Sequence, residues 1–238
     1  MFDHVDIGVS NLDASRRFYE LALGRPTAEN EWLEWSEFGI TPVDGEHPLT
    51  QHLHIGFGVE SREAVDAWWR QMIDAGYRSD GEPGPRPEYN ETYYGAFVLD
   101  PDCNSVEAVH HARSRTGAID HLWLRTRDLV ATKRLYEAIA PAVGIAVGWE
   151  PPGRVGFSDG DGSFTFVQGD EPTECVHLAF GVGGLDAVAE FHRLALEAGF
   201  TDNGGPGERP QYHAGYYGAF ALDPFGNNVE AVFHDRRS

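Results

Sequence analysis

The sequence repeats itself once, and this internal repeat constrains the fold more than any other feature. Residues 93–111 read YYGAFVLDPDCNSVEAVHH and residues 216–234 read YYGAFALDPFGNNVEAVFH, with 14 of 19 positions identical. The offset is 123 residues here but 117 near the N-terminus, where the Asp-His pair at 3–4 recurs at 120–121. The second half therefore carries an insertion. Two copies of this length predict tandem domains rather than a solenoid of short repeats.

Each half follows the same order of predicted elements. In the first half, an alternating strand at residues 3–9 precedes a helix that ends near Gly24. A second strand at 52–59 then precedes an amphipathic helix at 61–75. Each helix is followed by segments with strand character, so the order strand, helix, strands occurs twice in each half. We therefore expect four such modules in the chain.

A segment rich in glycine and proline precedes the last strands of each half. It covers residues 81–87 in the first half and 204–210 in the second, and we expect both segments to be loops. Together with the repeat, this order predicts a first domain at residues 1–112 and a second domain at 117–238, joined by a short linker.

Composition and charge narrow the class of protein. Lys and Arg total 18 against 38 Asp and Glu, a formal net charge of −20, which would repel the phosphates of a nucleic acid. No apolar run approaches the ~20 residues that cross a bilayer, and the N-terminus lacks the features of a signal peptide. With only two cysteines, no disulfide framework is expected. We expect a cytoplasmic protein, monomeric or homodimeric, that acts on a small molecule and binds neither nucleic acid nor membrane.

Three residues recur at matched places in both halves: a histidine in the opening strand, a histidine in the middle strand and a glutamate in the final strand. Two imidazoles and one carboxylate can hold a divalent metal while leaving coordination positions open for substrate. One such residue alone is more often solvated or hydrogen-bonded, but the recurrence of all three weakens that interpretation. The candidate ligands are His4, His54 and Glu107 in the first half and His121, His177 and Glu230 in the second.

The module order, the placement of these histidines and the closing motif G-A-F-x-L-D-P-x-x-N-x-V-E-A-V resemble the vicinal oxygen chelate superfamily. That superfamily includes glyoxalase I, extradiol dioxygenases, methylmalonyl-CoA epimerase and the fosfomycin and bleomycin resistance proteins. The resemblance covers nearly the whole chain. It implies an α+β fold in which four βαβββ modules form two cup-shaped, mixed eight-stranded sheets with flanking helices. It also implies a divalent metal ion (Fe, Mn, Zn, Ni or Co) held by the six candidate ligands.

The pairing of the modules stays open at the level of sequence. Pairing within a half would place the three candidate ligands of that half together in one cup. Exchange between the halves would instead give the sets His54, Glu107, His121 and His4, His177, Glu230. The list of residues is the same in both cases.

A fourth ligand and the reaction also stay open. Glyoxalase I uses a further Glu or Gln from the last strand of the earlier module, and only the loop-like Glu46 and Glu171 stand near that place here. Three ligands resemble the extradiol dioxygenase site more closely. Dioxygenase, lyase and isomerase chemistry therefore all remain possible outcomes of the resemblance.

Polar and aromatic side chains precede each closing hairpin and are the candidates for contact with substrate. Arginine binds a carboxylate or phosphate through paired hydrogen bonds, tyrosine donates to an oxyanion, and histidine moves a proton near neutral pH. The alternatives are that the arginines pair with surface acids and that the tyrosines only pack. Strand alternation allows one tyrosine of each adjacent pair, 93–94 and 216–217, to face the site. The candidates are Arg86, Tyr89, Arg209, Tyr212 and His213.

The two halves are not equally equipped, because Asn90 stands where the second half has His213. His111, at the end of a final strand, is expected to be solvated. The sequence favours a metal-dependent enzyme that acts on a small oxygen-bearing substrate. The alternatives are a non-catalytic binding protein of the bleomycin-resistance kind, whose acidic character suits a cationic ligand, and a tandem with vestigial sites. Tight metal binding separates the first possibility from the other two.

Overall fold

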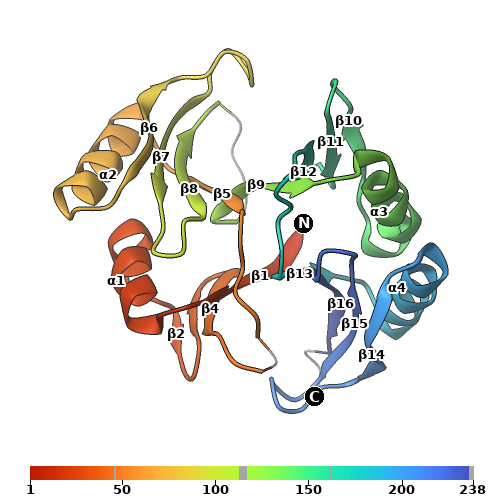
Figure 1. The fold of residues 1–238 in the computed structure, drawn as a ribbon. Coiled ribbons are helices and arrows are strands. Elements are labelled where there is room, and N and C mark those ends of the chain that lie inside the picture. Colours follow the sequence, from red (N-terminus) through yellow and green to blue (C-terminus); the bar gives the residue numbers. More distant parts are fainter. Residues whose placement is uncertain (46, 113–116, 161, 236–238) are drawn as a thin grey trace.

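The computed structural model describes residues 1–45, 47–112, 117–160 and 162–235. It contains two mixed eight-stranded sheets and four helices (Figure 1). The α+β fold of four βαβββ modules that the resemblance implies is therefore confirmed. The middle of the expected linker lies outside the described residues, as does Glu46.

The four modules follow one another along the chain. Module 1 contains β1 (Phe2–Val9), α1 (Leu12–Leu23), β2 (Ala28–Glu29), β3 (Leu33–Trp35) and β4 (Phe38–Pro42). Module 2 contains β5 (His54–Gly58), α2 (Arg62–Asp74), β6 (Ser79–Pro85), β7 (Tyr94–Leu99) and β8 (Ser105–His110). Module 3 contains β9 (Ile119–Thr126), α3 (Leu129–Val143), β10 (Ala146–Trp149), β11 (Arg154–Ser158) and β12 (Ser163–Gln168). Module 4 contains β13 (Val176–Gly181), α4 (Leu185–Ala198), β14 (Thr201–Glu208), β15 (Tyr216–Leu222) and β16 (Asn228–His234).

Each sheet is built from one module of each half. Sheet 1 joins modules 1 and 4 in the order β14-β15-β16-β13-β1-β4-β3-β2, and sheet 2 joins modules 2 and 3 in the order β10-β11-β12-β9-β5-β8-β7-β6. The modules meet at the antiparallel pairs β1–β13 and β5–β9. The structure thus has the exchange between halves that the sequence left open. The division into domains at 1–112 and 117–238 stays a prediction, and each of these segments contributes to both sheets.

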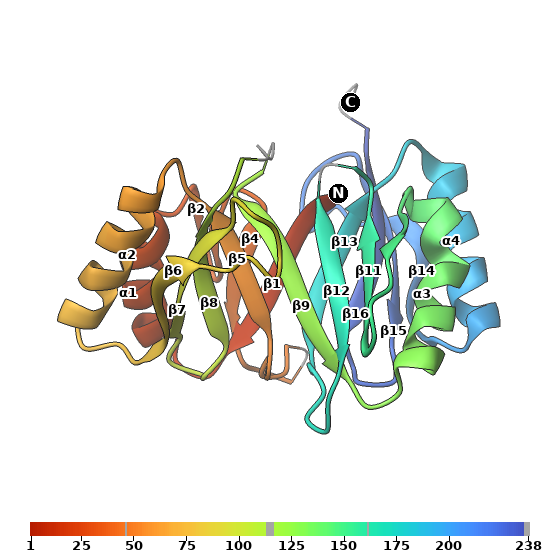
Figure 2. The ribbon, with the colours of Figure 1, turned by 90° about the horizontal axis from the view of Figure 1, so that it is seen from above.

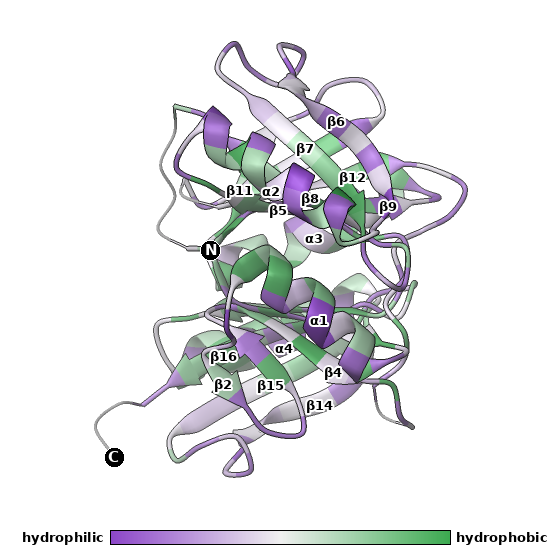
Figure 3. Cartoon of the chain, turned by 90° about the vertical axis from the view of Figure 1, so that its left-hand side faces the viewer, coloured by the Kyte–Doolittle hydropathy of each residue, from purple (hydrophilic) through white to green (hydrophobic). Residues whose placement is uncertain are grey.

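The helices lie on the outer side of the sheets, α1 and α2 at one end of the molecule and α3 and α4 at the other (Figure 2). Val5 and Ile7 of β1 belong to the same buried cluster as Phe18 of α1. Because successive side chains of a strand point to opposite faces, His4 and Asp6 face away from that helix. In Figure 3, α1 and α2 carry both hydrophilic and hydrophobic positions, as amphipathic helices do. Within the described residues, no helix is long and apolar enough to cross a membrane.

Local sequence determines where the helices begin and end. Asn11, Ser61 and Asp128 each accept, through the side chain, a hydrogen bond from the backbone N–H three residues later, and so cap α1, α2 and α3. Gly144 and Gly199 end α3 and α4 in the left-handed conformation that glycine adopts without strain. The helix expected at residues 61–75 is observed within one residue of each end.

The expectation that residues 81–87 and 204–210 are loops is wrong. Most of each segment lies in an edge strand, β6 or β14, which pairs with β7 or β15. Both ladders contain register shifts beside glycines. An edge strand tolerates proline and irregular pairing because one of its sides needs no partner in the sheet.

Candidate metal sites

Three of the candidate ligands converge in sheet 2 and form what we call site 2. The Nε2 atoms of His54 and His121 lie 3.1 Å apart. The Oε2 atom of Glu107 lies 3.1 Å from the Nε2 of His54 and 3.3 Å from that of His121. Glu107 is fully buried, whereas His54 is only partly buried. One side of the cluster is therefore accessible.

The other three candidate ligands converge in sheet 1 and form site 1. The Oε2 atom of Glu230 lies 3.0 Å from the Nε2 of His177 and 3.5 Å from the Nε2 of His4. The two imidazole rings are stacked, with centroids 5.0 Å apart. In each site, one ligand atom of every member lies within 4.8 Å of the others. Both sites combine residues from the two halves of the chain.

The register of the strands places these side chains together. Gly56 on β5 is flanked by Glu107 on β8 and by His121 on β9. The imidazole of His121 lies over this glycine, where a Cβ would stand only 2.4 Å from its Cε1 atom. Site 1 has Ala179 at the same place, between Glu230 and His4. The two histidine rings have similar separations in the two sites, 5.0 Å between centroids in site 1 and 5.2 Å in site 2.

An aspartate binds the outer nitrogen of one histidine in each site. In site 2, the Nδ1 of His121 lies 2.9 Å from Asp120 Oδ1, and Asp120 Oδ2 lies 2.7 Å from the Nε2 of His111. A carboxylate at Nδ1 holds a proton there and leaves Nε2 available to a metal. The side chain of His111 is only 7% exposed and is paired with Asp120, so the expectation that it is solvated is wrong. The corresponding residues of site 1 are His4, Asp3 and His234.

A tyrosine hydroxyl binds the glutamate of each site from behind. Tyr93 donates to Glu107 at 2.8 and 2.9 Å, and Tyr216 donates to Glu230 at 2.7 Å. The hydroxyl of the next residue, Tyr94, instead donates to a residue of α2. One tyrosine of this adjacent pair therefore faces the site, as strand alternation predicts.

The carboxylates control the charge of the buried histidines. Burial alone would lower the pKa of His121, but Asp120 and Glu107 outweigh it and raise this pKa to about 9. Burial would likewise lower the pKa of His4, but its acidic neighbours raise it to about 9. The pKa of His54 is lowered, chiefly by burial. In each site, the acidic neighbours therefore favour the protonated form of one histidine beside the glutamate.

These donor sets fit a divalent metal ion. Two imidazole nitrogens and a carboxylate oxygen are ligands of Fe, Mn, Co, Ni and Zn. The aspartates behind His4 and His121 orient these rings so that Nε2 faces the glutamate. A bound cation would supply the positive charge that a proton supplies in the metal-free cluster, so metal and proton compete for the same place.

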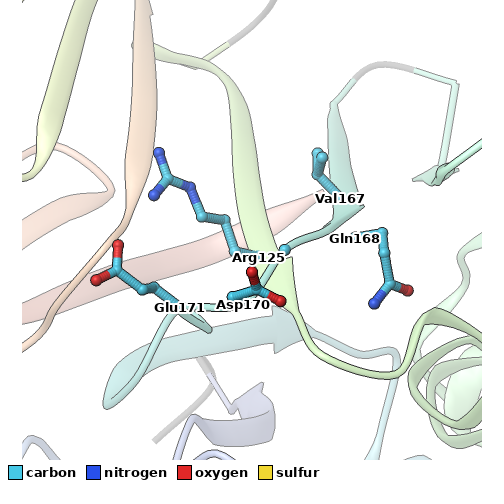
Figure 4. Close-up of a pocket in the computed structure, with 6 residues that line it drawn as sticks. Arg125, Val167, Gln168, Asp170 and Glu171 are labelled. Atoms are coloured by element: carbon cyan, nitrogen blue, oxygen red, sulfur yellow. The ribbon is translucent and has the colours of Figure 1, made fainter.

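The fourth ligand of glyoxalase I has no acidic counterpart at the matching positions. In the strand register, Glu107 lies opposite Gly56, which is two residues after His54. Glu230 lies opposite Ala179, which is two residues after His177. In the other two modules, the residues opposite the positions two after His121 and His4 are Thr165 in β12 and Gly39 in β4. Glu171 lies beyond β12 and, with Asp170 and Arg125, lines a cavity of about 510 Å³ at the end of that strand (Figure 4).

A phenylalanine ring separates each arginine expected to contact substrate from a histidine of its site. Arg86 donates to a backbone carbonyl of β6, and its guanidinium lies 5.5 Å from the ring centroid of Phe97. The Phe97 ring in turn lies 5.7 Å from that of His54. Arg209 has the same arrangement over Phe220 in site 1. Neither arginine forms an ion pair with an acid in the described part of the chain.

The other three substrate candidates lie around the supporting tyrosines. The ring centroid of Tyr89 is 5.1 Å from that of Tyr93, and Tyr212 has the same relation to Tyr216 at 4.8 Å. The Nε2 of His213 lies 2.9 Å from the Nδ1 of His234. The role of these residues in binding substrate stays a prediction.

Comparison with known proteins gives a family match for the first half of the chain and a fold for its whole length. Residues 1–108 match the sequence model of the Glyoxalase/Bleomycin resistance protein/Dioxygenase superfamily. Glyoxalase I from Zea mays is 18% identical, with a TM-score of 0.71 over 98% of this chain and 92% of that chain. A putative dioxygenase from Bacillus subtilis subsp. subtilis str. 168 is 12% identical, with a TM-score of 0.67 over 98% of this chain and 85% of that one. No curated protein matches the sequence.

Paired βαβββ modules form two eight-stranded sheets, and each sheet carries a His/His/Glu cluster that could hold a metal ion. The first half of the chain matches that superfamily in sequence, and the whole chain has the fold of these two solved structures.

Proposed function

We propose that the chain is a metal-dependent enzyme that acts on a small oxygen-bearing substrate through its 2-His-1-Glu sites. One observation supports this above all: in site 2, three potential ligand atoms converge within 3.3 Å around a fully buried glutamate. The second, similar cluster in site 1 adds to this support. We further propose that the protein works in the cytoplasm, as a monomer or homodimer.

A divalent ion bound in such a site supplies a Lewis acid that polarises vicinal oxygens of a substrate. The chain's own residues hold and orient the ligand atoms. Tyr93 holds the carboxylate of Glu107 in place, and Asp120 holds the ring of His121. Three protein ligands leave open positions, which a substrate with two neighbouring oxygens can occupy. A metal held by these residues would be compatible with dioxygenase, lyase or isomerase chemistry.

Metal content tests the proposal. Wild-type protein purified without chelators and supplied with Mn(II) or Fe(II) is expected to bind two equivalents. Glu107→Gln and Glu230→Gln should each retain one equivalent, because each removes one of three ligands from one site. Glu31→Gln, a change at an exposed glutamate, is the matched control and should retain two.

Absence of metal binding after trials with Fe, Mn, Zn, Ni and Co would overturn the proposal. The second candidate function, a non-catalytic binding protein, would then be favoured. The formal net charge of −20 supports that alternative for a cationic ligand. Binding of a cationic ligand gives no reason for two His/His/Glu clusters, each with an aspartate and a tyrosine hydrogen-bonded to its members.

A further inference from the structure

The two sites differ at the residue two positions after the histidine of the opening strand, which is His121 in site 2 and His4 in site 1. In site 2 this residue is Trp123, and in site 1 it is Asp6. Trp123 lies directly opposite His54 in the β5–β9 register and therefore faces the candidate ligands. Its ring centroid lies 6.0 Å from that of His54 and 6.5 Å from that of His121. An indole surface thus adjoins the cluster of site 2.

A positively charged group lies on this indole. The guanidinium carbon of Arg154, from β11, is 4.8 Å from the ring centroid of Trp123. Within the described part of the chain, the Arg154 guanidinium has neither a hydrogen bond nor a carboxylate within 4.0 Å. In a chain with a net charge of −20, a half-buried arginine without an acidic partner is unusual. Its donors remain available to an anion.

Further aromatic side chains extend the surface around this arginine. The ring of Tyr89 lies 5.2 Å from that of Trp123, and Tyr89 is 39% exposed. Trp149 is 41% exposed, and its ring covers Gly156, two residues after Arg154 on β11. Site 2 is therefore bordered by exposed aromatic rings and by one unpaired cation.

Site 1 has acidic residues on the equivalent face of its sheet, and Asp6 stands at the position of Trp123. Asp6 extends over Gly39, where a Cβ would stand 1.9 Å from its Oδ1 atom. Glu34 pairs with the same glycine from β3 and accepts a hydrogen bond from the indole of Trp32. Two carboxylates therefore lie beside site 1, whereas an indole and a guanidinium lie beside site 2. Such carboxylates repel an anion.

We propose that site 2 selects a planar ligand that carries a carboxylate. The carboxylate binds Arg154 through paired hydrogen bonds, and the flat body of the ligand packs on Trp123. The opposite end of the ligand then lies toward His54 and Glu107. This inference rests on the proposed function for the chemistry at the end of the ligand near His54 and Glu107. Recognition of the carboxylate by Arg154 does not need the metal. Site 1 takes no such ligand.

Binding of benzoate and of its neutral counterpart benzamide to metal-free protein tests the inference. Tryptophan fluorescence should show that wild type binds benzoate about tenfold more tightly than benzamide, as expected for a charge-assisted paired contact. Arg154→Gln should abolish this preference, and Arg154→Lys should retain only part of it, because lysine cannot form the paired contact. Arg193→Gln removes the same charge from the outer face of α4 and should leave the preference intact.

Equal binding of the two probes to wild type, a preference that survives Arg154→Gln, or no binding of either probe would each overturn the inference. A parallel measurement separates it from the proposed function. In Mn(II)-loaded protein, the paramagnetic ion should accelerate the proton relaxation of bound benzoate, and benzamide should show less effect. A preference for benzoate in a protein that binds none of the five metals tried would overturn the proposed function alone.

Discussion

At the scale of single residues, the hydroxyl of Tyr93 tests how site 2 is held together. It donates to both oxygens of Glu107, a carboxylate without exposed surface. Tyr93→Phe leaves these oxygens with one donor fewer and the carboxylate free to rotate. We expect the Mn(II) affinity of site 2 to fall by about tenfold, the lower end for loss of such support, as measured by calorimetric titration.

Tyr216→Phe provides the matched comparison for that prediction. Tyr216 donates to Glu230, so this variant should weaken site 1 and leave site 2 unchanged. If either variant weakened both sites equally, the tyrosines would act through overall stability and not through the carboxylate that each contacts.

A second prediction at this scale concerns Gly56. A methyl group there would lie 2.4 Å from the ring of His121, so Gly56→Ala must displace the imidazole. We expect site 2 to lose Mn(II) affinity by about tenfold as one ligand moves. Gly58→Ala, on the same strand with no atom within 4 Å of the new methyl, is the control and should bind as wild type. Unchanged binding by the Gly56 variant would show that His121 is not a ligand.

The repeat makes some residues of the site predictable and hides others. The six candidate ligands stand out because each has a copy at a matched place. The aspartate before His4 and His121 is also repeated, but its contacts with that histidine and with His234 or His111 become visible only in the folded chain. Trp123 and Arg154 have no copies in the first half, so comparison of the halves gives no signal for them. Their proximity arises from strand pairing across the sheet.

At the scale of elements, the turn between β7 and β8 carries a buried acid. Burial raises the pKa of Asp100 to about 6, although Tyr19 and backbone N–H groups donate to it. The folded protein therefore binds this proton more tightly than the unfolded chain, whose pKa is near 3.8. The stabilising effect is complete below about pH 4 and is lost as the pH rises through about 6.

Asp100→Asn removes that titration. The unfolding free energy of wild type relative to the variant should fall by up to about 3 kcal/mol between pH 4 and pH 7, since two pKa units correspond to about that amount. Urea unfolding at several pH values measures the difference. Asp223→Asn, in the equivalent turn, should show the same sign because burial also raises the pKa of Asp223. A difference that is constant with pH would contradict the prediction.

The elements themselves show where pattern reasoning succeeds. Helices with a capping side chain and an apolar face were predictable within a few residues, as for α2. The edge strands β6 and β14 were not, because glycine and proline suit a loop as well as an edge strand. Only pairing with β7 and β15 distinguishes the two possibilities.

At the scale of the whole molecule, the chain crosses between sheets so that its halves interlock. The opening strands of all four modules are apolar on the side that faces the helices. This apolar pattern therefore fits pairing with a module of the same half or with one of the other half. This is why the sequence could not decide the pairing. In the structure, β1 pairs with β13 and β5 with β9, and the ring of Phe2 contacts those of Phe164 and Phe180.

Separate halves of the chain test this interlocking directly. Site 1 takes His4 from the first half and its other two residues from the second, and site 2 takes only His121 from the second half. Fragments 1–112 and 117–238 should each bind Mn(II) weakly when alone, because neither contains a complete set of ligands. Mixed, they should form a one-to-one complex by light scattering and bind two equivalents. A first fragment with Glu107→Gln should restore only one equivalent, whereas a full equivalent bound by either fragment alone would show that modules can pair within a half.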